Sequence, residues 1–169
     1  MDLELRHRLP KGGEKFYAGL KQRIAIDTRS LAAFRILMGM LLVVDIILRS
    51  RNFNYFYTEI GVMPLAEAVQ HTPDNAFSIY YLTTDPAIIA VLFFIQALVG
   101  IQLIVGYKTR IATVLAFLFV VSLQHRNMYV LSYADTLYRL LLFWAMFLPL
   151  GERWSIDAVN RVSLPRLQI

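Results

Sequence analysis

Four long apolar stretches constrain the fold of this 169-residue chain more than any other feature of its sequence. They cover residues 28–48, 86–105, 110–124 and 135–150. A helix needs about 20 mostly apolar residues to cross the hydrocarbon core of a bilayer, and the first two stretches nearly meet this length. The last two are shorter, so their helices are expected to extend into flanking residues or to lie in a thinner bilayer. The sequence therefore predicts an all-α integral membrane protein with four transmembrane helices in a single domain.

The lysines and arginines that flank these stretches predict how the chain is oriented. Residues 1–29 carry seven, residues 106–110 between the second and third stretches carry two, and the C-terminal tail carries three. The opposite ends of the stretches carry only Arg49, Arg51 and Arg126. Because cytoplasmic loops carry the excess of basic residues, both termini are expected in the cytoplasm. We expect a multi-pass protein of a cell membrane, of the prokaryotic plasma-membrane kind.

Composition excludes several other classes of function. The chain has no cysteine, and its three histidines are far apart without metal-motif spacing, so no metal site is expected. The formal net charge of +5 is concentrated beside the apolar stretches, so the expected partner is membrane lipid and not nucleic acid. The first apolar stretch is too long for the core of a signal peptide, so it is expected to remain as a membrane helix.

Two segments outside the apolar stretches suggest contact with the membrane surface. Residues 14–26 repeat apolar side chains at helical spacing, which predicts either an interfacial amphipathic helix or an ordinary lead-in to the first span. The long loop between the first two stretches is rich in phenylalanine and tyrosine, which favour the membrane–water interface. We expect this extracytoplasmic loop to form short interfacial helices near residues 64–71 and 76–82 and to cover a cavity.

Polar residues at the predicted outer ends of the helices form the candidate site. Five belong to this side of the membrane: Asp45, Arg126, Asn127, Asp135 and Arg139. A charge at the bilayer centre costs about 3 kcal/mol on insertion scales, so Arg139, one turn inside its stretch, is expected to share partners. Together the five would line a wet, substrate-binding pocket for an anionic or quinol-like head group, with the arginines as hydrogen-bond donors.

The same residues also have a purely structural interpretation. Asp45 and Arg49 are four positions apart, as are Asp135 and Arg139, so each pair could form a local ion pair along one helix. Asp135 could equally cap the start of its helix. The sequence leaves both interpretations open.

Other polar residues are interpreted as structural. Asp27 is placed to cap the first membrane helix, and Asp85 to cap the second, where Pro86 occupies the first helical position. Arg35 lies in the inner half of the first stretch, where its long stem could reach the cytoplasmic headgroups or pair with Asp157.

Short motifs in a fixed order give the chain a family resemblance. They are DTRSLAAFRI at 27–36, Y…GVMP at 57–64, GYKTR at 106–110, SLQHRN at 122–127, and D…R…FLP…SID at 135–157. In order and spacing they resemble the HTTM (horizontally transferred transmembrane) domain, the family of the vitamin K-dependent gamma-carboxylase. The resemblance is to the N-terminal half of that domain, and especially to its prokaryotic members.

The resemblance implies a carboxylase-like or oxidoreductase-like membrane enzyme acting on a quinol or lipid-like substrate at the extracytoplasmic side. It implies reduced vitamin K or another quinol as the cofactor. The family's catalytic lysine lies in a later span, so the chain is expected to be incomplete at its C-terminus or a reduced version, with further spans or a partner subunit completing it. The carboxylase has an Asn-His pair where this chain has Ala134 and Asp135, so no histidine role carries over.

The alternative function is a non-catalytic membrane scaffold, an assembly partner or a subunit of a small-solute carrier. This alternative predicts that the helices pack without a cavity between them. It also predicts that the five polar side chains are scattered or satisfied within their own helices.

Overall fold

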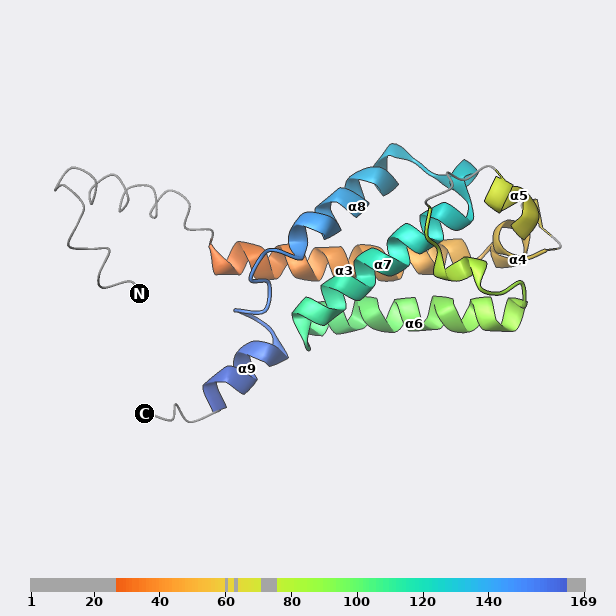
Figure 1. Cartoon of the computed structure of the whole chain (residues 1–169). Coiled ribbons are helices and arrows are strands. Elements are labelled where there is room, and N and C mark those ends of the chain that lie inside the picture. Colours follow the sequence, from red (N-terminus) through yellow and green to blue (C-terminus); the bar gives the residue numbers. More distant parts are fainter. Residues whose placement is uncertain (1–26, 60, 63, 71–75, 164–169) are drawn as a thin grey trace, which may run out of the picture.

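The computed structural model describes residues 27–59, 61–62, 64–70 and 76–163, and within these ranges every regular element is helical (Figure 1). The elements are α3 (Thr28–Ser50), α4 (Phe53–Tyr57), α5 (Leu65–Gln70), the 3-10 helix η1 (Ile79–Tyr81), α6 (Pro86–Val105), α7 (Thr109–Arg126), the 3-10 helix η2 (Met128–Val130), α8 (Tyr133–Ala145) and α9 (Ile156–Ser163). The prediction of an all-α protein is confirmed for these residues. The amphipathic segment expected at 14–26 lies outside them.

Two of the helices, α3 and α6, are long and apolar enough to cross a membrane. Helix α7 has 18 residues and α8 has 13, and neither is both long enough and apolar enough to count as a membrane span on its own. Helix α8 ends at Ala145, five residues before the expected end of the fourth stretch. Pro149 accounts for this early end, because proline has no N–H to donate and disfavours helical geometry in the residue before it.

Helices α3 and α6 lie side by side along most of their length, α7 packs against α6, and α8 packs against α7 (Figure 1). Glycines allow the close approach of α3 and α6. A Cβ atom on Gly39 would lie 2.8 Å from the carbonyl oxygen of Gly100 and 2.9 Å from the amide nitrogen of Ile104. Small residues at a crossing of this kind are typical of helices that pack within lipid.

Aspartates begin both apolar helices. Asp27 accepts a hydrogen bond from the amide of Arg29 at 2.9 Å, and Asp85 accepts one from the amide of Ala87 at 2.8 Å, with Pro86 in the first turn. Both caps were expected, because a carboxylate satisfies amides that have no partner within the helix.

The side chain of Arg35 connects the end of α6 to the chain that follows α8. Gly106 ends α6 in the left-handed region, at φ +75°, where a Cβ atom would overlap the guanidinium of Arg35. Arg35 is fully buried and donates to the carbonyl oxygens of Leu103 at 2.9 Å and Trp154 at 2.6 Å. The side chain therefore does not extend to the headgroups, and the first of its two expected roles is wrong.

Asp157 attracts Arg35 electrostatically, in line with the second expected role. Its carboxylate accepts from the amides of Lys108 at 2.8 Å and Thr109 at 2.7 Å, and from the Thr109 hydroxyl at 2.7 Å. It thus caps the N-terminus of α7 from a distant part of the chain. A carboxylate suits this place, because the helix dipole is positive there.

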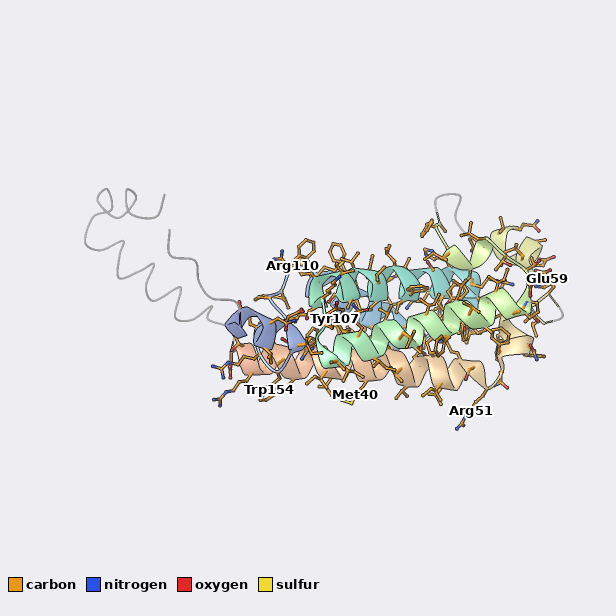
Figure 2. All side chains as sticks on the ribbon, turned by 90° about the horizontal axis from the view of Figure 1, so that it is seen from below. Met40, Arg51, Glu59, Tyr107, Arg110 and Trp154 are labelled. Atoms are coloured by element: carbon orange, nitrogen blue, oxygen red, sulfur yellow. The ribbon has the colours of Figure 1, made fainter. Side chains whose placement is uncertain are left out.

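The helices expose apolar side chains over much of their outer surface. Figure 2 shows Met40 projecting outward from α3. The other exposed large apolar side chains include Leu41, Val44 and Ile47 on α3, Val91, Phe94 and Leu98 on α6, Ile111, Val114 and Leu118 on α7, and Leu137, Leu140 and Trp144 on α8. All four helices therefore present an apolar face to their surroundings.

Candidate functional site at the C-terminal end of α3

Arg49, in the last turn of α3, is the centre of an ionic cluster. Its Nε donates to both carboxylate oxygens of Asp45 at 2.8 Å, and its Nη2 donates to Oδ1 of Asp135 at 2.6 Å. Its Nη1 donates to the hydroxyl of Tyr57 at 3.2 Å. We call these four residues the Arg49 cluster. One guanidinium thus joins α3 to α4 and to the first turn of α8.

The turn before α8 fixes the direction of the Asp135 carboxylate. Ser132 is the N-cap of α8, and its amide and hydroxyl donate to Oδ2 of Asp135 at 2.7 and 2.9 Å. This is a capping box with aspartate at the third helical position. Oδ2 therefore serves the local cap, while Oδ1 is directed to Arg49. Asp135 contributes to the cap, but it is not the N-cap residue.

The cluster is shielded from solvent to different degrees. The side chain of Arg49 is 11% exposed, that of Asp135 is 17% exposed, and that of Asp45 is 35% exposed. Tyr57 is buried, and this burial raises the pKa of its phenol, so the hydroxyl stays neutral and can accept from Arg49. The more accessible carboxylate of Asp45 is the part of the cluster that a ligand can reach.

A cavity of about 260 Å³ adjoins the cluster. Asp45, Arg49, Asn52 and Tyr57 provide its polar lining, and its apolar walls are Leu48, Phe56 and Val130. Apolar walls with a few convergent polar groups are the usual composition of a small-molecule site.

Arg126 and Asn127 lie at the end of α7, where they are buried against α4. Arg126 donates from Nη2 to the carbonyl oxygen of Tyr57 at 3.3 Å, and Asn127 donates from Nδ2 to that of Phe56 at 3.1 Å. Neither side chain lines the cavity. Their contacts position the α4 backbone, and with it the Tyr57 hydroxyl and the Phe56 ring.

Arg139 is separate from the cluster. It is half-buried, and no hydrogen bond or ion pair joins it to any other residue in the described ranges. The local pair with Asp135 is not formed, because Asp135 binds Arg49 from another helix. The structure thus brings together Asp45 and Asp135, places Arg126 and Asn127 behind them, and leaves Arg139 outside.

Sequence reasoning missed the two residues that complete the cluster. The sequence indicates Arg49 as a local partner of Asp45 and as a basic residue at the outer end of the first stretch, but not as a partner of Asp135. Tyr57 begins one of the short motifs of the family resemblance, but no sequence feature indicates that its hydroxyl meets Arg49 while the side chain of Tyr55 is exposed.

Aromatic residues of the loop between α3 and α6 cover this end of the bundle. Phe93 of α6 forms edge contacts with Phe53, Tyr57 and Tyr80, with ring centroids 5.2 to 5.8 Å apart. The Tyr80 hydroxyl also donates to the side-chain carbonyl of Gln96 at 2.8 Å. These contacts hold the loop over α6 and fix the wall that carries Tyr57.

In the part of the chain that the structure describes, no group of three histidine, aspartate or glutamate side chains is arranged to hold a metal ion. The fold and the site define a helical protein with two apolar helices of membrane length and a shielded ionic cluster beside a small cavity. Comparisons with protein-family models, with curated proteins and with solved structures found no match.

Proposed function

We propose that the chain is a multi-pass membrane protein in which α7 and α8 cross the bilayer together with α3 and α6. The exposed apolar faces of all four helices support this arrangement, because water-soluble monomers rarely expose large contiguous apolar surfaces. The excess of basic residues at the opposite end of the bundle supports an extracytoplasmic position for the Arg49 cluster. Further spans or a partner subunit remain part of this proposal.

The absence of cysteine from the sequence allows a direct test of this topology. We expect single cysteines at Asn54 and Tyr133, both exposed, to react with a membrane-impermeant maleimide added to intact cells. Cysteines at Tyr107 and Glu152, also exposed, should react only after the membrane is permeabilised. Labelling of Tyr133→Cys and Glu152→Cys from the same side would show that α8 does not cross.

The cavity beside Asp45 is proposed to bind a hydroxyl-bearing aromatic head group of the quinol type. The observation that carries this proposal is the Asp45 carboxylate, which lines an apolar cavity, is held by Arg49, and remains one-third exposed. A carboxylate accepts a hydrogen bond from a ring hydroxyl, and Leu48, Phe56 and Val130 can pack against the ring. A volume near 260 Å³ suits one substituted ring better than a whole isoprenoid quinol. The resemblance to the gamma-carboxylase family points to the same substrate class.

Duroquinol, a soluble tetramethyl quinol, is a suitable probe for calorimetry under anaerobic conditions. We expect it to bind at least tenfold more tightly than its dimethyl ether, because a hydrogen bond to a charged group is worth about 1.5–3 kcal/mol. Asp45→Asn should remove most of this difference. Asp135→Asn also removes a carboxylate that binds Arg49, but Asp135 does not line the cavity. This variant should therefore lose less affinity for duroquinol than Asp45→Asn does.

One observation favours the alternative of a non-catalytic membrane module. Each nitrogen of the Arg49 guanidinium already donates to a protein group. The cluster can therefore hold α3, α4 and α8 together without any ligand. Equal binding of duroquinol and its dimethyl ether, or no binding of either, would contradict the quinol proposal and favour this alternative.

A further inference from the structure

A second and larger cavity, of about 550 Å³, lies at the opposite end of the bundle. It is bordered by the first turn of α7 and by the chain from the end of α8 to α9. Ile111, Met146 and Leu148 are among its apolar walls, and Lys108, Arg110 and Glu152 are its charged, exposed residues. Figure 2 shows Arg110 at the end of the molecule opposite to Glu59, which lies near the Arg49 cluster end.

The N-terminus of α7 borders this cavity, and its first backbone amides already donate hydrogen bonds to a protein side chain. The carboxylate of Asp157 accepts from the amides of Lys108 and Thr109 and from the Thr109 hydroxyl. Both of its oxygens are engaged, so this group completes the cap of α7. A ligand would therefore meet the side chains around the cavity and not the backbone amides of the helix.

The three remaining charged side chains have no ionic partner among the described residues. The Nζ atom of Lys108 lies 5.6 Å from the centre of the exposed Tyr107 ring, while no ion pair forms at Arg110 or Glu152 within the same ranges. Two cations and one carboxylate thus border a cavity with apolar walls. This combination matches a ligand that carries both charges and also has an apolar part.

We propose that this cavity binds the head group of a phosphatidylethanolamine-type phospholipid. Lys108 and Arg110 pair with the phosphodiester, Glu152 accepts hydrogen bonds from the primary ammonium, and Ile111, Met146 and Leu148 contact the upper part of an acyl chain. Basic pockets between membrane helices on the cytoplasmic side bind the phosphates of anionic lipid head groups, and the carboxylate of Glu152 adds a group that suits an ammonium. The proposal depends on the proposed membrane topology, which places this cavity in the cytoplasmic leaflet, but it does not depend on quinol binding.

The charge pattern distinguishes among common phospholipids. Phosphatidylcholine has the same phosphodiester, but its quaternary ammonium has no N–H to donate to Glu152. Phosphatidylglycerol has no cation at all, so Glu152 opposes its net negative charge. We therefore expect phosphatidylethanolamine to bind more tightly than either of the other two.

Native mass spectrometry of the purified full chain, exchanged into micelles doped with one phospholipid at a time, tests the proposal. We expect a Lys108→Gln/Arg110→Gln variant to bind phosphatidylethanolamine roughly 30-fold less tightly, about fivefold for each cation. The matched control is Arg51→Gln/Arg153→Gln, which removes two exposed arginines that do not line the cavity and should bind as the unaltered chain does.

Glu152→Gln provides an independent measurement. It should abolish the preference for phosphatidylethanolamine over phosphatidylcholine while increasing the binding of phosphatidylglycerol. Equal binding of all three lipids by the unaltered chain, or equal losses in the two double variants, would overturn the proposal. Failure of the proposed topology would instead appear as extracellular labelling of Tyr107→Cys, which is a separate readout.

Discussion

Replacing Arg49 by methionine is expected to lower the free energy of unfolding by about 1.5–3 kcal/mol, because it leaves partly buried carboxylates without their counter-charge and its hydrogen bonds. Asp45 and Asp135 both bind this guanidinium, and the side chain of Asp135 is only 17% exposed. Loss of Arg49 also removes the donor that holds the Tyr57 hydroxyl. Unfolding in detergent, followed by circular dichroism against increasing denaturant, measures the effect.

Arg51→Met is the matched control for this experiment. Arg51 lies at the C-cap of α3, is exposed, and forms no ion pair within the described part of the chain. Surface substitutions of this kind change stability by about 0.5 kcal/mol or less. A loss for Arg49→Met no larger than that for Arg51→Met would show that the cluster contributes little to stability.

Neutralising the carboxylates of Asp45 and Asp135, which Arg49→Met leaves without a partner, should restore part of the lost stability. We expect Arg49→Met/Asp45→Asn/Asp135→Asn to be more stable than Arg49→Met alone, since a neutral amide is far cheaper to bury than an unpaired carboxylate. No recovery in the triple variant would mean that Arg49 stabilises the protein through its packing and not through its charge.

Gly39→Ala is expected to lower the free energy of unfolding by about 1–3 kcal/mol, because the new methyl group would overlap backbone atoms of α6. The two nearest backbone atoms are the Gly100 carbonyl oxygen at 2.8 Å and the Ile104 amide nitrogen at 2.9 Å. Backbone atoms within a helix cannot turn aside as a side chain can, so α3 and α6 must move apart. The same denaturation experiment in detergent measures the loss.

Gly100→Ala, on the facing helix, is the matched comparison. Its new Cβ would meet a side-chain atom of Val43 at 2.8 Å, and the nearest backbone atom, the Gly39 oxygen, lies at 3.3 Å. Because a valine methyl can shift, we expect a smaller loss than for Gly39→Ala. The reverse order of losses would contradict the crossing geometry of α3 and α6.

Helix beginnings could be predicted from sequence because they depend on neighbouring residues. The roles of Asp27 and Asp85 follow from a carboxylate that bonds amides two positions later, and the structure confirms both. The end of α8 could not be predicted as well from the sequence. Its apolar stretch runs on to residue 150, whereas the helix ends at Ala145 before Pro149.

The candidate site could be predicted only in part. Asp45 and Arg49 are neighbours on one turn of α3, so their pairing follows from helical spacing. The partner of Asp135 could not be chosen in the same way. Arg139 has the correct spacing along α8, but Arg49, 86 residues away in sequence, forms the bond.

By itself, the sequence determined the all-α class, the two helices of membrane length and the local caps, because hydropathy and short-range hydrogen bonds act along a few turns of chain. Tertiary structure alone decided that Arg49 joins Asp135, that Arg35 binds the Leu103 and Trp154 carbonyls, and that Asp157 caps α7. Each of these bonds depends on how helices rotate and cross when their side chains pack. That packing is a property of surfaces brought together from distant parts of the chain, so no local pattern encodes it.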